Sequence, residues 1–256
     1  MKSLVSIKNN EEIDLMRNAN KIVVGALNLL IDKATDGANT KDLDRYAENY
    51  ALDNYALPAF KNYKGYPASI CISINNQVVH GIPSEKKILK DGDVVSIDFG
   101  VNYKGYFGDA ALTLIIGQPI NEIDKQLVKV TKRALELGIA KAKNGNRIVD
   151  ISKAIQDFVE SNKFHVVKQF VGHGIGKNLH EPPEVPNYYK PGYNLRLKPG
   201  MVLAIEPMVN IGTSDVNVNN DGWTVVTKDK SNSAHFEHSV LITDNEPEIL
   251  SFGIKK

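Results

Sequence analysis

Two aspartates, Asp98 and Asp109, stand eleven residues apart in apolar surroundings, with a glycine-containing segment between them. The run from Val94 to Phe99 is almost continuously apolar, which predicts a strand buried on both faces and therefore a buried Asp98. If the chain folds back around residues 102–105, the two carboxylates lie roughly opposite one another on adjacent strands, about 5 Å apart. Buried like charges at that distance cannot both ionise cheaply, so either one is protonated or a cation lies between them.

Similar apolar segments contain two more acids and a histidine. Glu206 ends one apolar strand, Glu237 lies inside another over residues 234–242, and His173 is flanked by glycines in residues 171–176. These segments contain no Lys or Arg that could balance the acids. Two divalent cations would balance four carboxylates, and oxygen-rich ligation with one histidine favours Mn, Fe, Co or Zn over a structural zinc site.

Such a constellation has a defined chemistry. Two metal ions about 3.5 to 4 Å apart, bridged by carboxylates and a hydroxide, generate a nucleophile at neutral pH and polarise a carbonyl group. The predicted reaction class is metal-assisted hydrolysis.

The individual residues allow simpler interpretations. Asp98 alone would more often be capped by backbone N–H groups, so the metal interpretation depends on the whole set of ligands. Cys71 is interpreted as a small buried hydrophobic residue, because no Cys-His-Asp order accompanies it. The remaining histidines receive no role, and His238 points to the strand face opposite Glu237. These histidines are His165, His235 and His238.

The elements that position these residues follow a helix-helix-strand order that occurs twice. The first helix is expected from Asn10 to a stop at Asp36-Gly37, and the second begins with Thr40 as its N-cap. The third is expected from Asn121 to Asn144-Gly145, and the fourth from about residue 147 to about residue 162.

An offset of 108 residues aligns Leu89–Asp98 with Leu197–Glu206, with five identities in ten columns. Two explanations are open, an internal duplication or a common turn-to-strand sequence pattern, Leu-Lys-x-Gly-x-Val, that occurs twice by chance. Duplication predicts two halves, roughly 1-118 and 119-256, packed around an approximate two-fold axis, with Asp98 and Glu206 at equivalent places.

The composition is that of an ordinary soluble globular protein. The 256 residues are 42% hydrophobic and carry a formal net charge of +1, which gives no electrostatic reason to expect specific nucleic acid or an anionic membrane as a partner. The N-terminus has no apolar region typical of a signal peptide, and the single cysteine fits a reducing compartment. A cytoplasmic protein is expected.

These residues closely resemble the metal signature of the methionine aminopeptidases. The resemblance covers nearly the whole chain, and is to the short bacterial type I form. Its motifs are Gly108-Asp109, Gly172–Gly176, Ile205–Met208, Glu237-His238, Val79–Pro83, Leu179–Pro183 and Asp221–Thr224, together with Asp98.

The resemblance implies an α+β fold known as the pita-bread fold. Two pseudo-two-fold related helix-helix-strand halves surround a curved antiparallel sheet with helices on its outer face. A single catalytic domain over residues 1-256 is expected. The implied activity is removal of the initiator methionine from nascent proteins and peptides with a small second residue, by attack of a metal-bridging hydroxide on the scissile carbonyl.

The resemblance also assigns roles to residues. The metal ligands are Asp98, Asp109, His173, Glu206 and Glu237, with Asp109 and Glu237 bridging two ions whose identity stays open among Co, Mn, Fe and Zn. His80 contacts the substrate backbone, His180 steadies the carbonyl oxygen, and Glu206 takes a proton from the attacking water. The methionine pocket is lined by Tyr63, Tyr66, Cys71, His80 and Trp223, and His180 also contacts substrate.

Some positions depart from the common bacterial pattern. Phe60 replaces a frequent Cys and Leu179 a usual Phe, and both border the implied pocket and remain apolar. Ala110-Ala111 replaces Thr-Ser, which removes hydroxyl groups behind the metal site.

The implied partner is the N-terminus of a nascent polypeptide, with transient contact with the ribosome, and a monomer is expected. Two other functions stay open. One is a proline-directed peptidase of the prolidase or aminopeptidase P type, and the other is a peptide-binding module with the same fold and no catalysis.

Overall fold

The computed structural model describes residues 5–255 of the chain. Its helices are α1 (Asn10–Lys33), α2 (Thr40–Asp53), the short 3-10 helix η1 (Tyr63–Gly65), α3 (Glu122–Lys141) and α4 (Ile148–Ser161). Its strands are β1 (Leu57–Pro58), β2 (Cys71–Ile74), β3 (Gln77–Val79), β4 (Val94–Tyr103), β5 (Tyr106–Ile115), β6 (His165–Val166), β7 (Gly172–Gly174), β8 (Glu181–Val185), β9 (Val202–Ile205), β10 (Met208–Asn210), β11 (Val216–Val218), β12 (Val225–Thr227), β13 (Ser233–His235), β14 (Glu237–Leu241) and β15 (Glu248–Ile249).

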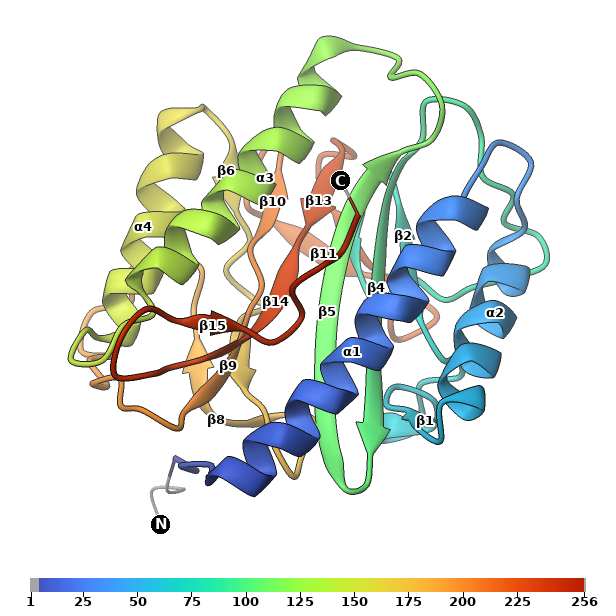
Figure 1. The fold of residues 1–256 in the computed structure, drawn as a ribbon. Helices are drawn as coiled ribbons and strands as arrows, with labels where there is room; N and C mark the ends of the chain where they lie inside the picture. Colours follow the sequence, from blue (N-terminus) through green and yellow to red (C-terminus); the bar gives the residue numbers. More distant parts are fainter. Residues whose placement is uncertain (1–4, 256) are drawn as a thin grey trace.

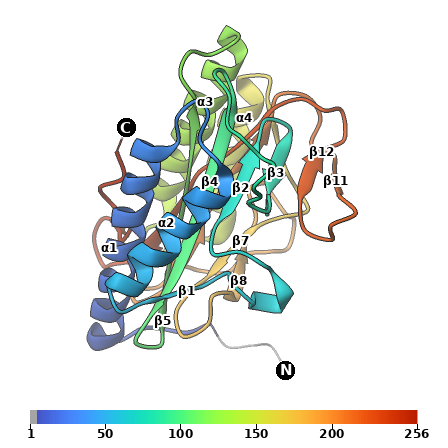
Figure 2. The ribbon, with the colours of Figure 1, turned by 90° about the vertical axis from the view of Figure 1, so that its right-hand side faces the viewer.

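A nine-stranded antiparallel sheet forms the centre of the molecule, in the order β1-β4-β5-β14-β9-β7-β8, with β2 paired to β4 and β15 to β14. Helix α1 packs on β4 and β5, and α3 contacts β13 and β14 (Figure 1). Figure 2 shows α1 and α2 on one side of the long strands and the small β11–β12 hairpin on the other. This arrangement is the α+β, pita-bread architecture that the resemblance implies, with the helices on the outer face.

The two halves are related by an approximate two-fold axis. The order β4-β5-β14-β9 is symmetric about the pairing of β5 with β14. Gly37 N–H donates to the carbonyl of Leu89 at 2.9 Å, and Gly145 N–H donates to the carbonyl of Leu197 at 3.2 Å. Both glycines have positive φ, of 80° and 87°, which a residue with a side chain rarely adopts. Residues related by the offset of 108 therefore share a backbone hydrogen bond as well as their amino-acid type.

The β4–β5 hairpin corrects the predicted register of the two aspartates. Its turn is Lys104-Gly105, with φ of 50° and 86°, as a two-residue hairpin turn requires. In the ladder Asp98 lies opposite Ala111, and Asp109 lies opposite Gly100. The aspartates, predicted to lie roughly opposite one another, are two residues away from direct opposition and are diagonal neighbours on one face of the sheet.

The helix ends differ slightly from the predictions. The N-cap of α2 is Asn39, whose side chain accepts the Lys41 N–H at 2.8 Å, and the prediction of Thr40 is wrong by one residue. The Thr40 hydroxyl instead donates to the Ser84 carbonyl and accepts the Ser84 N–H, both at 3.0 Å. Helices α1 and α3 end three residues before the predicted Asp36 and Asn144.

The segment predicted as a single strand over residues 234–242 is broken at Phe236 into β13 and β14. The break lies beside Pro207, where β9 gives way to β10, because proline has no N–H to donate to the ladder. Glu206 therefore stands at a bend of the sheet. None of the helices between residues 5 and 255 has the length and apolar character that a membrane crossing requires.

Candidate functional site

Five neighbouring strands of the large sheet each place one predicted metal ligand on the same side. The strands are β4, β5, β14, β9 and β7, in that order across the sheet. They carry, in the same order, Asp98, Asp109, Glu237, Glu206 (directly after β9) and His173. Residues that are distant in the chain become neighbours because antiparallel pairing brings strands from both halves together.

The side chains converge closely enough to share ions. Ligand atoms of Asp109, His173 and Glu237 all lie within 4.8 Å of one another. His173 Nε2 lies 3.5 Å from Glu206 Oε1. Asp98 stands outside these groups, in the diagonal position described above, and is partly exposed to the cavity, although a fully buried Asp98 is expected from the sequence.

A second group contains a histidine to which the sequence analysis gave no role. Glu206, His235 and Glu237 also have ligand atoms within 4.8 Å of one another. His235 Nε2 lies 3.8 Å from Glu206 Oε2 and 4.0 Å from Glu237 Oε2. The sequence does contain a signal for His235. It stands two residues before Glu237 in the same apolar segment, and strand alternation places residues two apart on one face.

Several buried polar atoms at this point of the structure have no hydrogen-bond partner, which is costly in a protein interior. They are Asp98 Oδ1, Asp109 Oδ1, Glu237 Oε1 and His235 Nε2. Within residues 5–255 none of the four carboxylates pairs with a Lys or Arg, and only Glu206 and Glu237 lie within ion-pair distance of imidazoles. This set of unpaired donor atoms fits divalent cations, because carboxylate oxygens and imidazole nitrogens are their usual ligands.

Burial and mutual repulsion oppose ionisation of the carboxyl groups. Burial raises the pKa of Asp98 to about 7. Burial and the neighbouring Asp98 charge raise the pKa of Asp109, and burial followed by the charges of Asp98 and Asp109 raises the pKa of Glu206. The pKa of Glu237 is raised by burial and then by Asp109, Glu206 and Asp98. Without a cation this cluster cannot hold four negative charges cheaply.

Burial keeps the imidazoles neutral, as metal ligation requires. It lowers the pKa of His173 to about 4 and that of His235 to about 3. His173 Nδ1 lies 2.9 Å from the Gly174 carbonyl oxygen, so the ring donates from Nδ1 and keeps the Nε2 lone pair free toward Glu206. Gly174 must be glycine, because an added Cβ would lie 2.3 Å from the Pro182 carbonyl oxygen.

Hydroxyl groups support the site despite the alanines at positions 110 and 111. The Ser239 hydroxyl donates to the Asp109 carbonyl oxygen at 2.8 Å. The Thr113 hydroxyl donates to the His235 carbonyl oxygen at 2.7 Å and accepts the His235 N–H at 2.9 Å. These contacts come from β14 and β5 themselves and fix the backbone on which the ligands stand.

A cavity of about 330 Å³ opens above the converging carboxylates. It is lined by every residue that the sequence analysis placed in the site. Its predicted lining residues are Tyr63, Tyr66, Cys71, His80, Asp98, Asp109, His173, His180, Glu206, Trp223 and Glu237. The divergent Phe60 and Leu179 also line it, and the residues that sequence reasoning missed are Lys64, Val79, Gln169, Phe170, Val171, Met208 and His235.

Aromatic rings make one wall of this cavity. Tyr66 and Trp223 pack edge to face with their centroids 5.1 Å apart. His80 packs edge-on against Phe170 at 5.5 Å and Trp223 at 6.2 Å. His80 has φ of 59°, an uncommon conformation for a residue with a side chain, and so its ring is held in place by its surroundings.

His180 also lines the cavity, with its ring centroid 4.2 Å from that of His173. Its Nδ1 lies 2.9 Å from the hydroxyl oxygen of Tyr63. Burial, His173 and Lys64 lower the pKa of His180 to about 3, so the ring is neutral near pH 7. The next residue, Glu181, forms a buried ion pair with Lys8 at 2.9 Å, which anchors the loop to the N-terminal segment.

Comparison with known proteins agrees with this geometry. The sequence model of metallopeptidase family M24 matches residues 14–244. This chain belongs to metallopeptidase family M24. A relative from Clostridium acetobutylicum named methionine aminopeptidase is 52% identical over 97% of this chain and 99% of its own length. The M24 chain is thus expected to depend on divalent metal ions, as a metallopeptidase does.

Solved structures lead to the same fold. The crystal structure of methionine aminopeptidase from Thermotoga maritima superposes with a TM-score of 0.95 at 45% identity, over 97% of this chain and 99% of that one. A prolidase from Pyrococcus furiosus shares the M24 fold with a TM-score of 0.79 at 25% identity, but this chain covers only 66% of it.

Proposed function

We propose that this M24 chain is a metal-dependent methionine aminopeptidase, which hydrolyses the peptide bond after an N-terminal methionine when the second residue is small. The observation that carries the proposal is the convergence of five ligand side chains from adjacent strands beneath a cavity with an apolar, aromatic wall. A single catalytic domain, residues 1-256, is proposed to supply both the metal ligands and the cavity wall.

The metal-holding residues proposed are Asp98, Asp109, His173, Glu206 and Glu237. Two divalent cations, with Mn, Co, Fe and Zn all suited to these donors, would activate water and polarise the scissile carbonyl. Asp109 and Glu237 are proposed as shared ligands, and Glu237 belongs to both groups of converging ligand atoms.

Three residues are proposed to act on the substrate. Glu206 accepts a proton from the attacking water, and Asn187 holds its backbone by donating from Nδ2 to the Glu206 carbonyl oxygen at 3.0 Å. His80 contacts the substrate backbone. His180 donates from Nε2 to the carbonyl oxygen where negative charge develops, because its Nδ1 can accept the Tyr63 hydroxyl proton.

The side chain of the N-terminal methionine is proposed to lie among Tyr63, Tyr66, Cys71, His80 and Trp223. Thioether sulfur contacts aromatic rings favourably, and the wall of Tyr66 and Trp223 offers two such rings. The divergent Phe60 and Leu179 keep this region apolar.

The proposed setting is a cytoplasmic monomer that meets the N-terminus of nascent chains, with transient contact with the ribosome. The composition and the single cysteine support the compartment.

The function is tested with purified protein and short peptides. Met-Gly-Met and Met-Ala-Ser should release free methionine in the presence of Mn²⁺ or Co²⁺, and a chelator should stop the reaction. Peptides that begin Met-Leu or Leu-Gly should be poor substrates. Activity that a chelator does not affect would contradict the proposal, and cleavage restricted to X-Pro bonds would support a prolidase-type enzyme instead.

A substitution tests the role of His180. His180→Gln should lower kcat about 10²-fold with a smaller change in KM, since one donor to the developing charge is lost. Metal affinity, measured by calorimetry, should stay close to that of the wild type. The exposed His165 provides the matched control, and His165→Gln should leave kcat unchanged. An equal loss in both variants would argue against the assignment.

A further inference from the structure

The cavity wall that carries Tyr66 and Cys71 runs through a segment without regular structure. Residues 66–70 belong to neither a helix nor a strand, and β2 begins only at Cys71. Backbone N–H groups buried in such a segment need other partners, because an unpaired buried amide costs free energy. The position of this wall therefore depends on whatever satisfies its amides.

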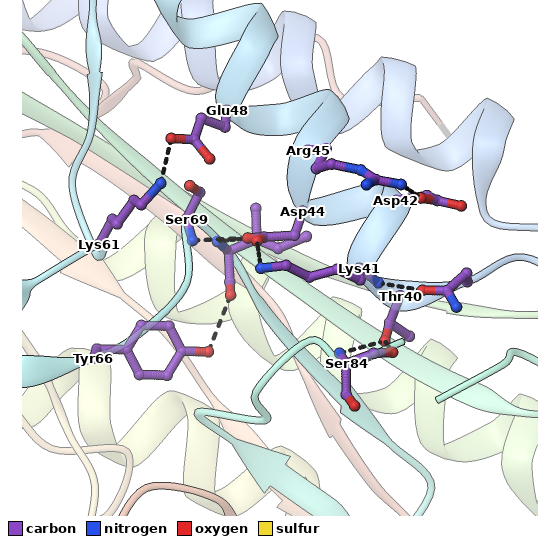
Figure 3. Close-up of polar contacts among 12 residues, drawn as sticks. Thr40, Lys41, Asp42, Asp44, Arg45, Glu48, Lys61, Tyr66, Ser69 and Ser84 are labelled. Atoms are coloured by element: carbon purple, nitrogen blue, oxygen red, sulfur yellow. Dashed lines mark hydrogen bonds and ion pairs between the residues drawn. The ribbon is translucent and has the colours of Figure 1, made fainter. Parts of the chain in front are cut away.

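A buried carboxylate on the outer layer supplies those partners. Asp44, on helix α2, is 2% exposed. Its Oδ1 accepts the N–H of Ser69 at 2.7 Å and the N–H of Ile70 at 3.2 Å. Figure 3 shows the carboxylate of Asp44 pointing from the helix to Ser69. Hydrogen bonds from amides to a carboxylate are strong and directional, so they fix the segment relative to α2.

The connection continues to the residues that face the cavity. The Tyr66 hydroxyl lies 3.0 Å from the Ile70 carbonyl oxygen and 3.0 Å from the Gly81 carbonyl oxygen, and donates to this pair. Gly81 follows His80, and the Tyr66 ring packs against Trp223. One carboxylate on α2 thus holds the backbone of the segment from which Tyr66 contacts Gly81 and Trp223 in the aromatic wall of the proposed methionine pocket.

The other contact of Asp44 is an ordinary helix ion pair. Its Oδ2 lies 2.8 Å from Lys41 Nζ, one turn earlier in α2. The Lys41 side chain is 37% exposed and that of Asp44 only 3%, so Lys41 offsets part of the cost of the buried charge without contacting the amides. Two further ion pairs involve this helix, Arg45–Asp42 within it and Glu48 with Lys61 of the following loop, and neither includes a residue of the segment 66–70 (Figure 3). Removing Lys41 therefore separates the ion pair from the amide contacts.

We propose that Asp44 is a positioning residue for the substrate side-chain pocket. Through the amides of Ser69 and Ile70 it fixes Tyr66 and Cys71, and so sets the preference for methionine over other apolar N-terminal residues. The proposal rests on the proposed aminopeptidase function for its kinetic part. The effect of Asp44 on the position of the wall can be measured without an activity assay. Trp223 is the only tryptophan of the chain, so its fluorescence reports on the wall.

The test compares Asp44→Ala, Asp44→Asn and Lys41→Met in the full chain. Asp44→Ala should raise KM for Met-Ala-Ser about 10-fold with kcat changed less than about 3-fold, as loss of hydrogen bonds to a charged group implies. Its preference for Met-Ala-Ser over Leu-Ala-Ser should fall by a similar factor. Trp223 emission should shift to the red in the same variant.

The other two variants separate positioning from general stability. Asp44→Asn should recover most of the wild-type KM and emission, since its amide oxygen can accept the same two N–H groups. Lys41→Met should match the wild type in KM, substrate preference and emission. A folded Asp44→Ala with wild-type KM, preference and emission would overturn the proposal.

If Asp44→Ala does not fold, a double-mutant cycle decides. Asp44→Glu keeps the charge but displaces the carboxylate from the two amides, so, unlike Asp44→Asn, it should change substrate preference. Its effect and that of Tyr66→Phe, which lacks the hydroxyl that donates to the Ile70 carbonyl oxygen, should be non-additive. Additive effects would overturn the proposal. A wild-type chain that releases no methionine would contradict the proposed function, whereas the emission of Trp223 in the Asp44 variants would still support or overturn the positioning role.

Discussion

Glu237→Gln is expected to lower kcat/KM for Met-Ala-Ser by at least about 10³-fold, because metal ions supply several kcal/mol of transition-state stabilisation. Glu237 is the residue that both groups of converging ligand atoms share, one with Asp109 and His173 and the other with Glu206 and His235. Its loss should therefore weaken the binding of both ions. The measurements are methionine release and the number of bound ions after dialysis.

The adjacent residue offers a matched control. His238 stands on the same strand but on the other face, where its Nδ1 lies 2.8 Å from the Ser251 hydroxyl. His238→Gln can keep a hydrogen bond to Ser251 and should retain wild-type kinetics and metal content. A Glu237→Gln enzyme that binds two ions and turns over normally would refute the ligand assignment.

The metal-free protein is expected to lose stability as the pH rises above about 4, the ordinary carboxyl pKa, through about 7 and beyond, because its buried carboxyl groups must then ionise without a cation. The pKa of Asp98 is raised to about 7, and those of Asp109, Glu206 and Glu237 are raised by burial and by one another. A carboxyl whose pKa is higher in the folded protein stabilises it at low pH, and this contribution disappears as the pH rises through the folded pKa.

The histidines of the site have the opposite effect on stability, and they act only below about pH 7. Burial lowers the pKa of His80 and His173 to about 4, and that of His180 and His235 to about 3. Their contribution is lost as the pH falls from about 6.5, the value of an unperturbed histidine, toward those lowered pKa values. Above about pH 7 they are neutral in both states, so the carboxyl groups decide the slope.

The experiment is urea unfolding of chelator-treated protein across this pH range, with and without saturating Mn²⁺. The metal-free free energy of unfolding should fall as the pH rises, because the folded protein holds protons that the unfolded chain has already released. With Mn²⁺ the curve should be flatter and higher, because the cation binds the ionised carboxylates of the folded state. Metal-free stability that rises between pH 7 and pH 9 would contradict this account of the cluster.

The candidate metal ligands could be predicted from the sequence because each is recognisable from its immediate neighbours in the chain. Each predicted ligand stands in or beside an apolar strand segment, where a charged or polar group is unusual and therefore visible. The repeat at an offset of 108 residues predicted that strands from both halves meet, and the order β4-β5-β14-β9 confirms it. The roles of the individual residues stay predictions until the variants are measured.

What the sequence missed depends on contacts between distant segments. The two-residue diagonal of Asp98 and Asp109 follows from a turn at Lys104-Gly105, and periodicity does not specify which residues form a turn. Thr40 matches an N-cap by type, yet its hydroxyl pairs with Ser84, which is 44 residues away. Such choices are made by tertiary partners that compete with local preference.

The sequence by itself determined the repeat and the set of five candidate metal ligands with its hydrolytic chemistry, because residue type, spacing and repetition are properties of the chain. The resemblance to the methionine aminopeptidases added the fold and the pocket residues. Only the tertiary structure decided that His235 joins the ligand cluster and that Asp44 supports the pocket wall from the outer layer. The physical reason is that a buried polar group is defined by the partners that fold around it, and those partners come from strands and helices far away in sequence.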